Sequence, residues 1–338
     1  MRRGGVSHSK GFVPLIQCPL PRSHMQLEPG LDHAIFPIAF QPPEGATEVP
    51  IWNGRGFSIG KVESAVLSYE VGSSGWTDGL TVFHEETAGE DHYIERASRR
   101  HAAKSLHRWL PAGSVSPVII DIGCSSGLML KVLREEFPHA SVAGADYIRG
   151  PLEALAAKSP GIPLIQFDLT KCPLPNESVD GIVLLNVLEH IDRDDLALHH
   201  VARILKPNGV AIIEVPAGPR LYDVYDKLLL HHRRYRMSAL LRKIDGCGLR
   251  VRERSHLGFF LYPGFWLAKR RGQRYLGQPE EVQRAIVSRN IRTASSHALM
   301  HGLMALEGAL RGWVYYPFGI RCLVTCQKAG PAAPEKIH

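Results

Sequence analysis

The chain has 338 residues with a formal net charge of +7; 44% of its residues are hydrophobic and 22% are charged. This composition is ordinary for a globular protein, and no apolar run approaches the roughly 18 residues that a membrane-spanning helix needs. The apolar run near the N-terminus is short and broken by proline, which argues against a signal peptide. The six cysteines form no CxxC pair, so we expect no zinc site and a cytoplasmic, reducing environment.

The first region along the chain is predicted to be a weakly ordered arm over residues 1–60. Its first 50 residues are rich in proline and glycine and show no periodicity. Met25 is an alternative start of the chain. A short tail over residues 329–338 is likewise predicted to be disordered, because chain ends that nothing ties down are seldom ordered.

A helical extension is predicted over residues 61–115. The polar segment ESAVLSYE at residues 63–70 is helix-like. A second helix is expected from about Glu90 to Leu110, where Pro111 follows and ends it.

Strands and helices alternate through residues 116–256, which predicts parallel βαβ units in a doubly wound sheet with helices on both faces. The predicted strands cover residues 118–121, 141–146, 163–168, 178–186, 209–216 and 249–255, and the predicted helices cover residues 127–137, 149–159, 192–206 and 237–248. Residues 257–316 are predicted to be a helical insertion before a last strand within residues 317–328. The region 116–256 is therefore the predicted core domain.

Basic residues are concentrated late in the chain. Residues 231–275 contain twelve Lys or Arg residues and only two acidic residues. Such a stretch can attract phosphate, nucleic acid or an anionic membrane surface, or it can form a solvated basic face.

The most informative motif is the turn DIGCSSG at residues 121–127, between the first strand and the first helix of the core. Its G-x-S-x-G letters also fit the nucleophile elbow of serine hydrolases, but no glycine-rich oxyanion loop precedes the strand. The second strand ends in Asp146, where a carboxylate can accept both hydroxyls of a ribose. The G-x-G-x-x-G fingerprint of nicotinamide dehydrogenases is absent. A nucleotide-type cofactor without pyrophosphate fits this pattern better than either alternative.

The turn, Asp146, the segment QFDLTKCPLPNESVDGIVLLNVLEHI and the segment LKPNGVAIIEVP together resemble a class I S-adenosylmethionine-dependent methyltransferase over residues 118–216. The resemblance implies a seven-stranded, mostly parallel, Rossmann-like sheet whose last strand is antiparallel. Residues 231–235 are similar to the H-x-R-R-Y stretch of a methyltransferase subgroup that is often linked to glycan or polysaccharide pathways.

The resemblance also implies roles for individual residues. Those implied to bind S-adenosylmethionine are Asp121 at its amino group, Gly123, Cys124, Ser125 and Gly127 along its methionyl and ribose end, Asp146 at the ribose, Tyr147, Asp168 and Leu169 at the adenine, and Asn186 and Val187 at the reacting end. The candidate general base is His231, followed by His232 and His190. Arg233, Arg234 and Tyr235 are the implied substrate-binding residues. No metal is expected.

The expected function is methyl transfer to a hydroxyl or amine of a small-molecule or glycan-type acceptor, which could bear a phosphate. A non-catalytic cofactor-binding scaffold is the alternative. A nucleic-acid methyltransferase is disfavoured, because residues 186–189 read NVLE where exocyclic-amine enzymes carry N/D-P-P-Y/F. The oligomeric state stays open.

Aromatic residues stand beside cations in residues 259–274. Five rings, those of Phe259, Phe260, Tyr262, Phe265 and Trp266, precede the four cations Lys269, Arg270, Arg271 and Arg274. This pattern is typical of a peripheral segment at the inner face of a membrane. Alternatively, the rings pack inward under a helical lid over the acceptor pocket.

Overall fold

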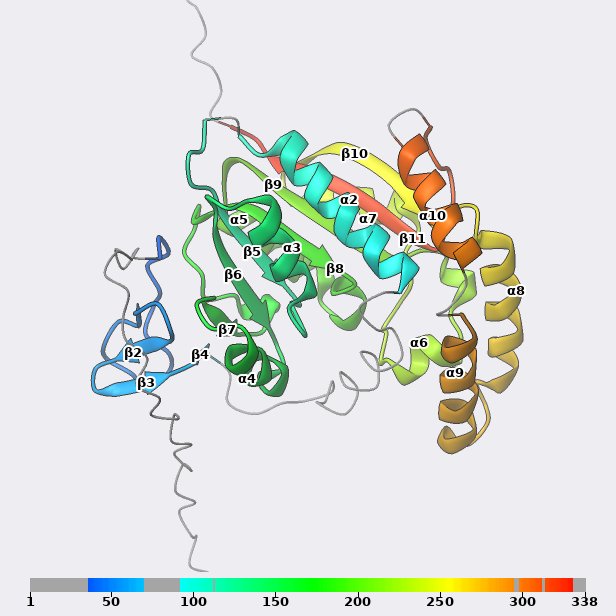
Figure 1. Cartoon of the computed structure of the whole chain (residues 1–338), viewed down its shortest axis with the longest axis horizontal. Helices are drawn as coiled ribbons and strands as arrows, with labels where there is room; N and C mark the ends of the chain where they lie inside the picture. The colour runs from blue at the N-terminus through cyan, green and yellow to red at the C-terminus, as the bar shows by residue number, and fades with distance from the viewer. Residues whose placement is uncertain (1–35, 70–91, 112, 295–297, 312–313, 331–338) are drawn as a thin grey trace, which may run out of the picture. The chain divides into compact units, whose positions relative to one another are not determined.

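The computed structural model describes residues 36–69, 92–111, 113–294, 298–311 and 314–330. The possible start at Met25, the first part of the predicted arm and most of the predicted tail lie outside these ranges. The described residues belong to one structural unit, in which a central sheet carries helices on both faces (Figure 1). Within the described ranges, no helix is both long and apolar enough to cross a membrane.

The central sheet has eight strands in the order β10-β11-β9-β8-β5-β6-β7-β4. Their bounds are β4 Val66–Ser68, β5 Val118–Ile122, β6 Ser141–Asp146, β7 Leu164–Gln166, β8 Val179–Leu185, β9 Leu205–Pro216, β10 Leu249–Leu257 and β11 Arg321–Lys328. β11 alone runs opposite to the other strands of this sheet, and it pairs antiparallel with both β9 and β10. The predicted doubly wound sheet with an antiparallel last strand is confirmed, and β4 adds one strand to the seven expected.

Helices cover both faces because the strands are apolar on both faces. On one face, Ile119 of β5 packs in a cluster with residues of α2 (Tyr93–Trp109), α3 (Leu128–Glu136) and α4 (Arg149–Lys158). On the other face, Ile120 of β5 packs with residues of α5 (Asp194–Ile204) and α7 (Met237–Gly246). A parallel strand buried on both faces reads as a continuous hydrophobic run, which is how β5 appears in the sequence.

The segment 63–70 was expected to be helix-like, and this prediction is wrong. Val62–Ser64 and Val66–Ser68 are the short strands β3 and β4. Val66 and Leu67 are almost fully buried in the two opposite apolar clusters. Burial on alternate sides requires an extended chain, so pairing of β4 with β7 outweighs the helical tendency of the segment.

The described part of the predicted arm is ordered, contrary to expectation. Phe36, Ile38 and Phe40 are buried in the core at every second position, and the Phe40 ring lies 5.2 Å from the Phe57 ring. A three-stranded sheet follows, made of β1 (Ile51–Trp52), β2 (Phe57–Ile59) and β3. The high proline and glycine content obscured this short alternating apolar pattern.

The helix predicted to reach Lys206 ends earlier, at Ile204. Leu205 is extended (φ −64°, ψ 134°) and begins β9. Pro207 disfavours helical geometry in the residue before it, which accounts for the early end. Lys206 instead pairs with Asp180 of β8 at 2.7 Å.

Three helices lie between β10 and β11. They are α8 (Tyr262–Gly272), α9 (Glu280–Ala294) and α10 (Ala298–Leu310). The short helix α6 (Val224–Leu228) follows β9 and lies beside α9 (Figure 1). The helices α6 and α8 carry acidic and basic groups that are described next.

Candidate active site

A cavity of about 1340 Å³ lies at the carboxyl ends of the parallel strands. Its lining includes Ile122 of β5, Asp146 of β6, Asn186 after β8 and Pro216 of β9. Open α/β sheets bind their ligands at this edge. Pockets for single drug-sized ligands usually measure roughly 300–1,000 Å³, so this cavity is larger than one such pocket.

Most residues predicted to bind the cofactor line this one cavity. They are Asp121, Gly123, Cys124, Ser125, Asp146, Tyr147, Asp168, Leu169, Asn186 and Val187. Gly127 is not among the lining residues. It is the N-cap residue of α3 and has φ 82°.

The glycine-rich turn keeps the backbone close to its neighbours. Gly123 has φ 82°, and a Cβ atom there would lie 2.4 Å from Cγ2 of Val187. A Cβ atom on Gly127 would lie 2.6 Å from Leu155. Both positions therefore require glycine, for conformation and for space.

Two carboxylates, those of Asp121 and Asp146, line this part of the cavity. The Asp146 carboxylate accepts hydrogen bonds from the backbone nitrogens of Ser125 and Ile148, each at 3.0 Å. Asp121 is 3% exposed, and burial together with the nearby charge of Asp146 raises the pKa of its carboxyl to about 8. This end of the cavity suits a ligand with hydroxyl donors and a cationic group.

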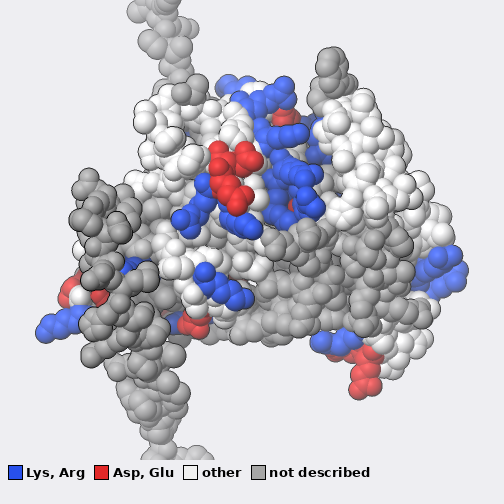
Figure 2. Space-filling view, in the orientation of Figure 1, with Lys and Arg blue, Asp and Glu red and all other residues white. Residues whose placement is uncertain are grey.

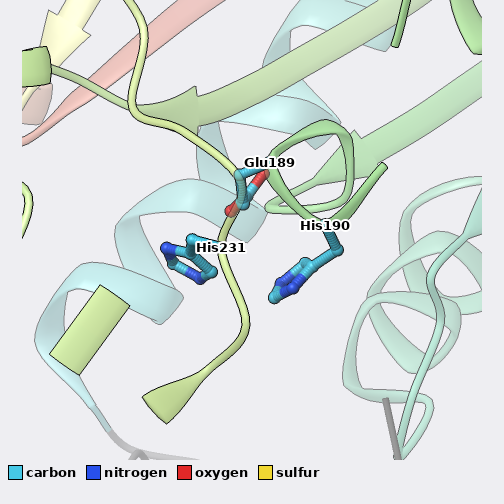
Figure 3. A group of neighbouring side chains, drawn as sticks. All are labelled: Glu189, His190 and His231. Carbon is cyan, nitrogen blue, oxygen red and sulfur yellow. The ribbon is translucent and has the colours of Figure 1, made fainter. Parts of the chain in front are cut away.

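A second polar group lies in the same cavity, formed by Glu189, His190 and His231 (Figure 3). One potential ligand atom from each residue lies within 4.8 Å of the other two. The two imidazole rings lie 4.7 Å apart, nearly perpendicular to each other. Glu189 is fully buried, and neither of its carboxylate oxygens has a hydrogen-bond partner among the described residues. Burial raises the pKa of its carboxyl to about 8.

His231 is oriented by a network of buried charges. Its Nδ1 atom lies 2.9 Å from Oδ1 of Asp226, which also accepts from Arg234 at 2.8 Å. Lys269 of α8 donates to Asp223 at 2.6 Å and to Asp226 at 2.9 Å. Burial alone would raise the pKa of Asp226, but Lys269 and the other donors hold it below its usual value. Burial lowers the pKa of His231.

Residues 120–213 match a family model described as a methyltransferase domain. Over this region the chain is similar to methyltransferases. It is 26% identical over 134 residues to a ubiquinone/menaquinone biosynthesis C-methyltransferase of Geobacter sulfurreducens, covering 38% of this chain and 50% of that protein. It is 30% identical over 138 residues to a trans-aconitate 2-methyltransferase of Azoarcus sp., covering 40% of this chain and 53% of that protein.

The fold also has structural relatives. A candidate sarcosine dimethylglycine methyltransferase from Galdieria sulphuraria superposes with a TM-score of 0.50 at 14% identity, over 75% of this chain and 99% of that one. At this identity the likeness concerns the fold alone. The chain spans about half the length of the curated relatives it matches. The region that matches the family model, residues 120–213, excludes residues 262–310, which contain the helices α8 to α10.

The predicted substrate-binding residues Arg233, Arg234 and Tyr235 make contacts within the protein. Arg233 pairs with Asp192 and Asp194, and the Tyr235 hydroxyl donates to Asp194 at 2.7 Å. Neither residue belongs to the described lining of the cavity. Arg234 lines the cavity, but its guanidinium donates to Asp226 and to two backbone carbonyls. These contacts do not support the predicted role of these side chains in binding substrate.

The sequence analysis did not identify Asp223, Asp226 and Lys269 as members of the buried charge network around His231. It also did not identify Glu189 as a site residue. Glu189 stands beside His190, in the motif from which only the histidine was selected. Asp223 and Asp226 form a capping box at the start of α6, and this D-x-x-D spacing was a usable signal. Lys269 could not be found, because it lies 43 positions after its partner Asp226.

The basic stretch 231–275 does not form one surface. Arg234 and Lys269 are buried, whereas Arg252 and Arg254 face a separate groove of about 800 Å³. The other cations lining this groove come from α2 and from the end of α10, namely Arg96, Arg100, Lys104, Arg108 and Arg311. Figure 2 shows Lys and Arg side chains gathered along α2. Charge that is contiguous in sequence is thus dispersed in the fold.

The aromatic residues of the segment 259–274 also separate. The Phe259 ring stacks on Tyr316 at 5.2 Å, and Phe265 lines the cavity at the carboxyl ends of the strands, beneath Lys269. Phe260 and Trp266 are partly exposed, at 36% and 43%. The arrangement fits inward packing for Phe259 and Phe265, and it removes Lys269 from the cations that were expected to face lipid.

Proposed function

We propose that this protein is an S-adenosylmethionine-dependent methyltransferase that acts on a hydroxyl or amine of a small-molecule or glycan-type acceptor. One observation carries the proposal: a single cavity joins the glycine-rich turn and its carboxylates to the Glu189–His190–His231 group. A two-substrate transfer needs both ends in one enclosed space, because orientation and exclusion of water supply much of the catalysis.

The cofactor residues are proposed to act as follows. The Asp121 carboxylate holds the amino group of the methionyl part, and the Asp146 carboxylate accepts from the ribose hydroxyls. The close approach at Gly123 leaves backbone groups of the turn facing the ligand. When bound, S-adenosylmethionine supplies a methyl group made electrophilic by its positively charged sulfur.

The acceptor is proposed to bind at the end that holds the two imidazoles. Its oxygen or nitrogen forms the new bond to the methyl carbon, while the carbon–sulfur bond breaks and its electron pair remains on sulfur. The acceptor also loses a proton, and polar groups positioned at that atom assist the loss. His231 and His190 are the proposed groups, with His232 beside them at the rim.

The acceptor class is proposed from residues 231–235. The similarity of residues 231–235 to the H-x-R-R-Y stretch supports a glycan-type acceptor. A phosphate on that acceptor would meet Arg193 and Lys227, which are exposed and line the cavity, rather than Arg233 and Arg234. The curated relatives carry names for different acceptors, so they do not narrow the choice.

A labelled-methyl assay on fractionated cell extract tests the proposal. We expect incorporation of label into one fraction, and loss of that incorporation with Asp146→Ala protein. If the protein binds S-adenosylhomocysteine by calorimetry but labels no fraction, the scaffold alternative is correct. Failure to bind the cofactor product would overturn both.

A further inference from the structure

We infer that Glu189, His190 and His231 form a binding site for a divalent transition-metal cation at the acceptor end of the cavity. The inference rests on the proposed function for its role in the reaction, but the binding itself does not depend on methyl transfer. It departs from the expectation from sequence that the protein has no metal site.

The geometry of the three side chains supports the site. The two rings and the carboxylate converge on one region (Figure 3), and their ligand atoms lie within 4.8 Å of one another. Metal–ligand bonds of about 2.1 Å place tetrahedral ligand atoms roughly 3.4 Å apart, so the side chains need to close by little more than about 1 Å. Small changes in side-chain torsions achieve such a movement without displacing η2 (Leu188–His190).

The environment of Glu189 gives a second, independent reason. Its side chain is fully buried, and its two oxygens accept no hydrogen bond from any described residue. Leaving a buried polar group without a partner is costly, and native proteins rarely retain one without a ligand or a function. A cation bound between Glu189 and the two imidazoles would supply the missing partner.

The contact between His231 and Asp226 prepares the histidine as a ligand. The Asp226 carboxylate accepts from Nδ1 of His231 and carries further donors from Arg234 and Lys269. The proton of the neutral ring is therefore on Nδ1, and the lone pair is on Nε2. A carboxylate behind a histidine, fixing its tautomer and orientation, is the usual support of a metal ligand.

The ligand types indicate which cations fit. Two imidazoles and one carboxylate suit Zn²⁺, Mn²⁺ or Fe²⁺, whereas Mg²⁺ prefers oxygen ligands alone. All three residues line the cavity, so a bound cation would keep an open position toward it. An acceptor hydroxyl at that position would lose its proton to water more readily, because the cation lowers the pKa of a bound oxygen.

The test is metal titration of the full-length protein after dialysis against a chelator, without cofactor or acceptor. Calorimetry with Zn²⁺ should show one tight site, and Mg²⁺ should give none. Glu189→Gln and His190→Ala should each weaken this site by more than about 100-fold, since loss of only a supporting residue costs about 10–100-fold. His232→Ala, next to His231 but outside the group, is the matched control and should leave the affinity unchanged.

A thermal-shift series separates loss of the ligand from loss of the fold. Zn²⁺ should raise the melting temperature of the wild type and of His232→Ala, but not that of Glu189→Gln. Equal Zn²⁺ affinity in the wild type and in Glu189→Gln would overturn the site. Binding of S-adenosylhomocysteine in the same samples, with no Zn²⁺ site, would defeat this inference and leave the proposed function standing. A Zn²⁺ site in a protein that methylates nothing would support the metal site and contradict the proposed function.

Discussion

The Nδ1 atom of His231 lies 2.9 Å from Oδ1 of Asp226, and both side chains are buried. Asp226 begins the chain of contacts that reaches α8 through Lys269. The orientation of the imidazole at the acceptor end is thus set by a residue that does not itself approach the glycine-rich turn. This relationship separates the residues expected to affect turnover from those expected to affect cofactor affinity.

Replacing His231 should lower turnover without weakening cofactor binding. His231→Ala removes the imidazole that Asp226 orients at the acceptor end, and loss of a group that assists proton removal costs roughly 100-fold or more. Methyl-transfer kinetics and calorimetry with S-adenosylhomocysteine measure the two effects. His199→Ala, an exposed histidine of α5, is the control. A decrease in turnover of less than about threefold would make His231 a structural residue.

Replacing Asp146, in contrast to His231, should weaken cofactor binding. Asp146→Ala removes a charged acceptor from the end of β6, and we expect cofactor binding to weaken by about 1–3 kcal/mol. The loop should also loosen, because the backbone nitrogens of Ser125 and Ile148 lose their acceptor. Calorimetry with S-adenosylhomocysteine is the measurement, with the exposed Asp192→Ala as control. Unchanged affinity would remove Asp146 from the cofactor site.

Lys269 is expected to matter for stability. Lys269→Ala leaves the buried carboxylates of Asp223 and Asp226 without their main cation, and breaking a buried ion pair in this way costs about 3–5 kcal/mol. Urea unfolding measures the loss. The neighbouring Arg270→Ala is the control, because Arg270 is exposed and its guanidinium lies over the Trp266 ring. Equal stability of the two variants would contradict the assignment.

Asp121 should make stability depend on pH. Its pKa in the folded protein, about 8, lies above the ordinary value of 3.8. The folded state keeps a proton that the unfolded chain releases, so this contribution to stability is complete below about pH 4 and is lost as the pH rises through about 8. Between about pH 5 and pH 8, the free energy of unfolding of the wild type should fall more steeply than that of Asp121→Asn. The difference in slope is at most about 1.4 kcal/mol per pH unit.

The same proton should govern cofactor binding. If the Asp121 carboxylate holds an ammonium group, affinity for S-adenosylhomocysteine should rise over that pH range in the wild type and stay level in Asp121→Asn. Asp192→Asn, an exposed carboxylate, should behave as the wild type in both measurements. Parallel slopes for the wild type and Asp121→Asn would show that Asp121 titrates in its ordinary range.

Binding to membranes through the segment 259–274 should be weak. With Lys269 buried, the exposed cations are Arg270, Arg271 and Arg274, each contributing about 1 kcal/mol near an anionic surface. We expect the protein to stay apart from anionic vesicles in a flotation gradient at moderate salt. Flotation of the wild type, abolished by reversing these three charges to Glu, would show that the partly exposed Phe260 and Trp266 do meet lipid.

The sequence predicted the parts of the fold that depend on local pattern. Val118–Ile122 is apolar at every position except Asp121, and such a run identifies a doubly buried strand without knowledge of its neighbours. β4 was missed because three residues carry no visible period, and the strand exists only through its pairing with β7. The same limit applied to the charge network, whose members come from α6, the following loop and α8.

The candidate site also contains residues that the sequence pattern identifies and residues that only the folded structure identifies. Gly123 and Asp146 follow consecutive strands, so the topology alone brings them to one edge of the sheet. Glu189 was passed over because an isolated acidic residue in a sequence is usually solvated. Only the folded chain shows that it is buried beside two histidines.

Asp226 serves two elements at once, since it pairs with His231 at the acceptor end and with Lys269 in the helices between β10 and β11. Those helices are therefore not an interchangeable module. Suppose that α8 to α10 were replaced by the helices of a related enzyme in order to change acceptor preference. The buried carboxylates of Asp223 and Asp226 would then lose their partner Lys269, unless the new helices supplied an equivalent cation. The region that can be exchanged as a unit extends back to Asp223, so diversification of the insertion and of the residues around His231 must proceed together.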